Sequence, residues 1–174
     1  MKIVEFKQAH SSNFTKGRKY PISHIVVHYV GAEGSAKANL SYFAGEGRQA
    51  SAHYFVDHGP VAGVYQSVKE EDMAWHAGNS EMNHRSIGIE LCCHKDSKGK
   101  WYFDKETVDT AVELVKVLMK KYNISSDRVI RHYDVTGKIC PAPWVEDEKQ
   151  LLDFKERFVE KEEVNDESTK EVIY

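Results

Sequence analysis

The clearest pattern in the first third of the chain is an alternation of side chains over residues 22–30. Two sets of residues would point to opposite faces: Ile25, Val27 and Tyr29 on one, and His24, Val26 and His28 on the other. This two-residue period predicts a β-strand. Short apolar stretches predict four further strands, over residues 52–56, 63–68, 87–91 and 129–133. A Gly-Pro turn separates the first two of these, which is typical of a β-hairpin.

Apolar residues at helical spacing predict a long helix over residues 105–122, with Asp104 as its N-cap. Its apolar stripe, which we expect to face the core, consists of Val108, Ala111, Val112, Val115, Leu118, Met119 and Tyr122. A short helix should span residues 36–44, and a last helix should span about residues 147–159. Because hairpins and crossovers mix with helices, the expected fold class is α/β (α+β), with a central mixed β-sheet flanked by helices.

Two polar stretches, residues 1–20 and 69–85, have no clear period and are predicted to be irregular. Residues 160–174 are highly charged and contain little that could be buried. Such a segment is typical of a disordered tail, or of a linker toward an absent second module. We therefore expect one domain over residues 1–159, followed by a charged tail over residues 160–174.

Composition excludes several classes of protein. The formal net charge of −3 leaves no basic excess to neutralise phosphates, which argues against a nucleic-acid binder. No stretch is long and apolar enough to insert into a membrane, and the N-terminus shows no signal peptide. The adjacent residues Cys92 and Cys93 would point to opposite faces of a strand. We interpret both as buried apolar side chains in a reducing cytoplasm.

The residues with the most distinctive chemistry lie between positions 131 and 141, where His132, Lys138 and Cys140 follow one another closely. A thiolate and a neutral imidazole together suit zinc, with a positive charge beside them. No structural zinc module has this spacing, so a third ligand must come from elsewhere, as in open catalytic zinc sites. His28, at the end of a strand, is one candidate. Competing ligand sets could instead include His24, His53 or His76.

Glu90 is distinctive because it lies in mid-strand among apolar neighbours. A carboxylate in that position needs either an ion-pair partner, such as Arg131, or a chemical task. Three other residues have ordinary structural explanations: Lys138 as an exposed loop lysine, Tyr54 as a core aromatic residue, and Trp75 as a loop anchor.

Six segments occur together in a recognisable order: residues 24–29, 51–57, 63–66, 74–78, 83–91 and 132–141. In this respect the chain resembles the zinc-dependent N-acetylmuramoyl-L-alanine amidases of the amidase-2 type. That family includes catalytic domains of phage endolysins and is related to the peptidoglycan recognition proteins. The resemblance covers roughly residues 22–158 and implies the corresponding amidase-like fold.

The resemblance also implies roles for individual residues. One catalytic Zn²⁺ would be bound by His28, His132 and Cys140. Glu90 would be the general base that takes a proton from the attacking water and passes it to the leaving amine. Lys138 and Tyr54 would stabilise the oxyanion, and Tyr54 competes with Glu90 for the role of base. The substrate groove would be lined by Trp75, His76, Asn79 and Asn83.

The function implied is hydrolysis of the amide bond between N-acetylmuramic acid and L-alanine in bacterial peptidoglycan. We expect a monomeric phage or prophage endolysin that stays in the host cytoplasm until its release to the cell wall. A cytosolic amidase that recycles muropeptides is an alternative within the same class. A non-catalytic peptidoglycan-binding protein is a second alternative, although such members of the family typically lose the cysteine ligand. A cysteine hydrolase using Cys92 or Cys93 is a third.

Overall fold

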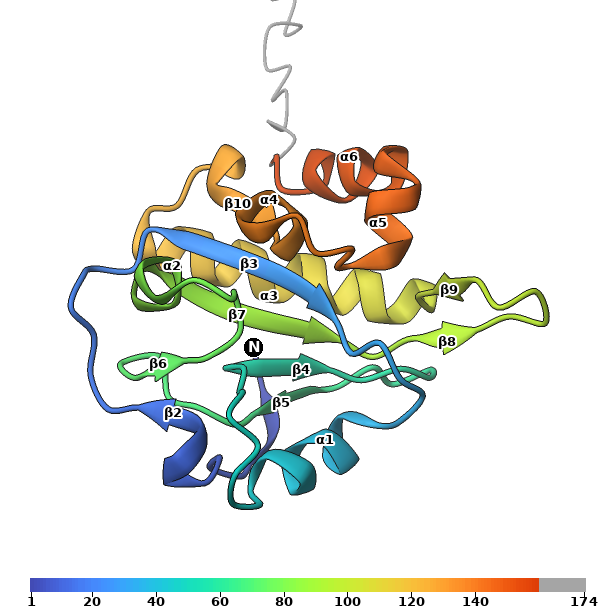
Figure 1. Ribbon diagram of the computed structural model, residues 1–174. Coiled ribbons are helices and arrows are strands. Elements are labelled where there is room, and N and C mark those ends of the chain that lie inside the picture. Colours follow the sequence, from blue (N-terminus) through green and yellow to red (C-terminus); the bar gives the residue numbers. More distant parts are fainter. Residues whose placement is uncertain (160–174) are drawn as a thin grey trace, which may run out of the picture.

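The computed structural model describes residues 1–159, and a six-stranded sheet lies at the centre of this part of the chain (Figure 1). The strands, in their spatial order, are β1 (Ile3–Phe6), β5 (Val64–Gln66), β4 (Tyr54–Val56), β7 (Ser86–Leu91), β3 (His24–Tyr29) and β10 (Val129–Arg131). Neighbouring strands are parallel except β4 and β5, which form the predicted antiparallel hairpin. The expected mixed sheet flanked by helices is confirmed.

Helices cover both faces of the sheet. Figure 1 shows α3 (Lys105–Tyr122), α5 (Ala142–Glu146) and α6 (Glu148–Glu156) on one side, and α1 (Ala36–Phe43) on the other. The main core lies between the sheet and α3, and it includes Ile87, Ile89 and Leu91 of β7. Because side chains alternate along a strand, Gly88 and Glu90 face the side that carries α1.

Helix α3 matches the predicted range of 105–122, and the middle of its apolar stripe is buried. Asp104 occupies the N-cap position but makes no side-chain capping hydrogen bond. Its carboxylate instead accepts hydrogen bonds from the Gly59 backbone at 2.8 Å and from His94 at 2.9 Å. Asn123 ends the helix in the left-handed conformation, with φ of 53°.

The two stretches predicted to be irregular contain short elements. The first includes β1, the 3₁₀ turn η1 (Ser11–Asn13) and β2 (Phe14–Thr15), and the second includes β6 (Met73–Ala74) and α2 (Ser80–Arg85). β2 and β6 pair with each other. Elements of two to six residues carry too little periodicity to be recognised, and they depend on pairing with distant segments.

The last third of the chain also contains more short elements than predicted. The strand expected over 129–133 ends at Arg131, where the one-turn helix α4 (His132–Thr136) begins. The last predicted helix, 147–159, corresponds to α6, which α5 precedes. A small hairpin of β8 (His94–Lys95) and β9 (Trp101–Tyr102) and the 3₁₀ turn η2 (Ser126–Arg128) complete the fold.

The prediction of a charged tail over residues 160–174 lies outside the described residues. Within residues 1–159, no helix has the length and apolar character needed to cross a membrane.

Cys92 and Cys93 are both fully buried, as expected of apolar side chains. Burial raises the pKa of each thiol, so neither is an activated nucleophile, and the structure gives no support to a cysteine hydrolase.

Candidate active site

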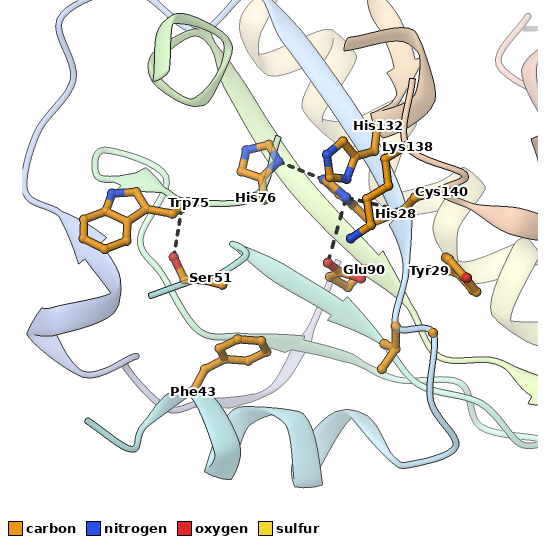
Figure 2. A pocket seen from close by; sticks show the side chains of 13 residues that line it. His28, Tyr29, Phe43, Ser51, Trp75, His76, Glu90, His132, Lys138 and Cys140 are labelled. Atoms are coloured by element: carbon orange, nitrogen blue, oxygen red, sulfur yellow. Dashed lines mark hydrogen bonds and ion pairs between the residues drawn. The ribbon is translucent and has the colours of Figure 1, made fainter. Parts of the chain in front are cut away.

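A cavity of about 330 Å³ opens on the α1 side of the sheet, near the carboxyl ends of β3 and β7 (Figure 2). His28 and Glu90 are direct register partners on these adjacent parallel strands, so both side chains reach the cavity from the sheet. β10 lies on the other side of β3, and the chain leaves it directly into His132. The sheet topology therefore brings together three segments that are far apart in sequence.

His28, His132 and Cys140 form a compact group whose ligand atoms all lie within 4.8 Å of one another. Their exposed fractions are 2%, 6% and 2%. The Cys140 Sγ lies 3.7 Å from His28 Nδ1, and the two imidazole rings meet edge to face with centroids 4.8 Å apart. Within the described residues, no other three His, Cys, Asp or Glu side chains are grouped in this way. The competing sets built on His24, His53 or His76 are therefore not supported.

The segment from His132 to Cys140 is held in place by Arg131, which is 6% exposed. The Arg131 guanidinium donates to Asp134, with a shortest distance of 2.8 Å, to the Trp144 carbonyl at 3.0 Å and to Glu148 at 3.3 Å. These bonds join the start of α4 to α5 and α6. Arg131 is thus committed to these partners, and its suggested ion pair with Glu90 is not formed.

Glu90 has no such partner in the described structure. Its side chain is 20% exposed, and its Oε1 lies 4.0 Å from His28 Nδ1. Its Oε2 is buried and accepts no hydrogen bond from any described group. Burial raises the pKa of Glu90 to about 8, against an opposing effect from the nearby positive charge of Lys138. A carboxyl group poised in this way beside a ligand cluster suits proton transfer.

Lys138 also lines the cavity, and Figure 2 shows its side chain reaching toward Glu90. Trp75 forms part of the wall from the opposite side. Its indole N–H donates to the Thr15 hydroxyl at 2.9 Å, and its backbone N–H donates to Ser51 Oγ at 3.0 Å. Trp75 is therefore both a wall of the cavity and an anchor for its own loop.

His76 lines the cavity, but both of its ring nitrogens face other protein side chains. Its Nδ1 lies 2.9 Å from His28 Nε2, and its Nε2 lies 3.2 Å from Ser86 Oγ. Burial lowers the pKa of both His76 and His28 well below the ordinary value, which keeps both rings neutral. The predicted substrate residue thus contacts one of the grouped histidines.

Three predicted site residues do not line the cavity, and their side chains have other partners. Tyr54 belongs to the core on the α3 side, where its hydroxyl donates to Glu70. The Asn79 side chain caps α2 by accepting from the Met82 N–H at 2.9 Å. The Asn83 side chain accepts from the backbone N–H groups of His76 at 3.2 Å and Ala77 at 2.8 Å. The two asparagines shape the loop that carries Trp75 and His76.

Tyr29 and Phe43 line the cavity and were not identified from the sequence. Tyr29 directly follows His28, but strand alternation assigned it to the opposite face. Phe43 is the last residue of α1, and nothing in the sequence indicates where that helix packs.

In the described residues, the mixed sheet thus places two buried histidines, a buried cysteine and a carboxyl group with one unpartnered oxygen in one cavity, an arrangement that suits a metal-dependent hydrolase. A family model described as N-acetylmuramoyl-L-alanine amidase (Amidase_2) matches residues 18–143. The amidase CwlL of Bacillus licheniformis is 36% identical over 169 residues, covering 83% of this chain and 45% of CwlL. The chain belongs to the Amidase_2 family, and it spans less than half the length of that relative.

Solved structures agree with this assignment. The structure of PlyL superposes with a TM-score of 0.76 at 25% identity, covering 92% of this chain and 98% of PlyL. A mutant endolysin from Bacillus subtilis superposes with a TM-score of 0.73 at 28% identity, covering 91% of this chain and all 100% of the other. The amidase-like fold expected from the sequence is confirmed.

Proposed function

We propose that this protein hydrolyses the amide bond between N-acetylmuramic acid and L-alanine in peptidoglycan, with one Zn²⁺ held by His28, His132 and Cys140. The observation that carries the proposal is the group of three ligand atoms within 4.8 Å, beside a Glu90 carboxyl with an unpartnered oxygen. Membership of the Amidase_2 family and similarity to CwlL, an N-acetylmuramoyl-L-alanine amidase, support the choice of bond.

The donor set fits zinc. Two imidazole nitrogens and one thiolate are ligands that zinc prefers, and three protein ligands leave a position for water or substrate. A zinc ion bound there would supply Lewis-acid activation of the water and the scissile carbonyl.

The protein's own groups then have distinct tasks. Glu90 accepts a proton from the attacking water and delivers it to the amine of L-alanine as the C–N bond breaks. Lys138 places a positive charge where negative charge develops on the carbonyl oxygen. The Trp75 indole offers a flat apolar face to a sugar ring or to the peptide stem.

The similarity to an endolysin of Bacillus subtilis supports a role in lysis of the bacterial cell wall. In this role the protein acts as a monomer that remains in the host cytoplasm until it is released to the wall.

Digestion of purified peptidoglycan tests the proposal, with and without a chelator and with identification of the products by mass. We expect peptides with a newly freed N-terminal alanine, and no release when zinc is removed. Glu90→Gln should lower turnover at least about 100-fold while zinc content and thermal stability are retained. Glu33→Gln, at an exposed carboxylate outside the cavity, is the matched control and should remain fully active. Cleavage of a different bond, or full activity in the chelator, would contradict the proposal.

A further inference from the structure

Three polar side chains form a continuous hydrogen-bonded line behind the candidate metal centre. His28 comes from β3, His76 from the loop that follows β6, and Ser86 is the first residue of β7. The His28 Nε2 to His76 Nδ1 distance is 2.9 Å, and the His76 Nε2 to Ser86 Oγ distance is 3.2 Å. Figure 2 shows His76 directed at His28 from the wall of the cavity.

The direction of these hydrogen bonds is fixed from the far end. Ser86 Oγ lies 2.6 Å from the Met82 carbonyl oxygen, which can only accept a hydrogen bond. The single hydroxyl proton of Ser86 is therefore donated to Met82, and Ser86 Oγ must accept from His76 Nε2–H. A neutral imidazole has one N–H, so His76 Nδ1 is the bare nitrogen and accepts from His28 Nε2–H.

The same reasoning leaves His28 Nδ1 without a proton. That nitrogen lies 3.7 Å from Cys140 Sγ and 4.0 Å from Glu90 Oε1, on the side of the ligand group. Both rings are buried, with exposed fractions of 2% for His28 and 9% for His76, which disfavours the imidazolium form.

The fold also leaves space for the His76 ring, which lies between His28 and Ser86. Gly88 lies in mid-strand in β7, where glycine has no turn to make. A Cβ added at Gly88 would lie 2.6–2.7 Å from three atoms of the His76 ring. The His76 imidazole thus packs directly on the β7 backbone, and a larger residue at position 88 would displace it.

We infer that His76 and Ser86 are positioning residues that fix the tautomer and orientation of His28, so that its Nδ1 is presented to the metal. This inference rests on the proposed zinc site, and it assigns His76 to the metal centre instead of the substrate. Hydrogen-bond partners behind metal-binding histidines typically contribute 10- to 100-fold to metal affinity.

Zinc affinity, measured by competition with a chromophoric chelator, tests the inference. His76→Ala should weaken zinc binding about 10- to 100-fold. His76→Asn places an amide oxygen near the position of Nδ1 and should restore most of the loss. Ser86→Ala should weaken binding in the same direction. Ser67→Ala is the matched control, because Ser67 is a fully buried serine whose hydroxyl has no described partner, and it should leave zinc affinity unchanged.

A second readout does not need zinc. In the ¹⁵N spectrum of the metal-free protein, the rings of His28 and His76 should both be neutral Nε2–H tautomers. Nδ1–H tautomers at both positions would overturn the inference. So would unchanged zinc affinity in both His76→Ala and Ser86→Ala, or a His76→Ala variant that raises only KM. In those cases wild-type amidase activity would leave the proposed function intact. Conversely, zinc binding that responds to these variants without release of N-terminal alanine would sustain the inference and refute the proposed function.

Discussion

The contact between Gly88 and His76 gives a prediction in which a single methyl group disturbs the candidate metal centre. In Gly88→Ala, the new Cβ would lie 2.6 Å from the nearest His76 ring atom, whereas ordinary contact begins at 3.4 Å. To restore ordinary contact, the His76 ring would have to move by about 0.8 Å, the difference between these two distances. A shift of that size would stretch or break its 2.9 Å hydrogen bond with His28.

The magnitude follows from three contributions. Overpacking of a buried site costs about 1–3 kcal/mol, and loss of the hydrogen bond adds about 1 kcal/mol. Alanine is favoured over glycine in a strand interior by about 0.5–1 kcal/mol, which offsets part of this. The free energy of unfolding should therefore fall by about 1–3 kcal/mol, and zinc affinity should fall by roughly 10-fold.

Urea unfolding in the presence of a chelator measures the stability term, and chelator competition measures the affinity. Gly63→Ala is the matched control, because its added Cβ would meet only the Val4 side chain closely, also at 2.6 Å. Val4 is 55% exposed on the edge strand β1, so it can move aside, and zinc affinity should not change. A Gly88→Ala protein with wild-type stability and wild-type zinc affinity would refute the reasoning.

Three further predictions concern other residues. Tyr54→Phe should leave peptidoglycan cleavage within about twofold and reduce the free energy of unfolding by about 1 kcal/mol, because its hydroxyl serves Glu70 and not the cavity. Cys140→Ser should lower zinc affinity more than the roughly 100-fold expected when a metal-binding histidine loses its hydrogen-bond partner. A Cys140→Ser protein that keeps its zinc in the chelator assay would show that Cys140 is not a ligand. Burial favours a raised pKa for Glu70, but hydrogen bonds from Lys121, Tyr122 and Tyr54 together hold its pKa below the ordinary 4.5. Its contribution to stability is therefore present above pH 4.5 and is lost as pH falls through the lower folded-state pKa. Urea unfolding near pH 6 and below pH 4 measures this. The free energy of unfolding should fall less between the two pH values in Glu70→Gln than in the wild-type protein, and equal falls would contradict the prediction.

The long elements of the fold could be predicted because their patterns are local. Eighteen residues of α3 carry a continuous apolar stripe, and its predicted range agrees with the structure. Helix α2 has six residues and no comparable pattern. It is held in part by Arg18, whose guanidinium donates to the backbone carbonyls of residues 83, 84 and 86. Nothing around residues 80–85 indicates that an arginine more than sixty positions earlier will bind there.

The candidate site, too, could be predicted from the sequence only in part. The resemblance to the amidase family predicted His28, His132 and Cys140, and the structure brings these three together. Orientation was harder to predict, because it depends on which layer covers each face of a strand. Tyr54 faces α3 while its neighbour Phe55 packs with α1, and alternation alone does not assign these layers. The resemblance predicted His76 as a substrate contact. The sequence does not indicate that Ser86, the first residue of β7, lies within hydrogen-bond distance of the His76 ring.

The candidate ligands have an uneven distribution along the polypeptide, since 112 positions separate His28 from Cys140. During translation, the first histidine leaves the ribosome long before the thiol that completes the trio. Nascent fragments that stop short of position 140 hold only part of the ligand set, so the hydrolytic capacity proposed here would arise only after that position has been synthesised. The complete set of candidate zinc ligands therefore exists only once the segment that carries Cys140 has been made and folded against His28.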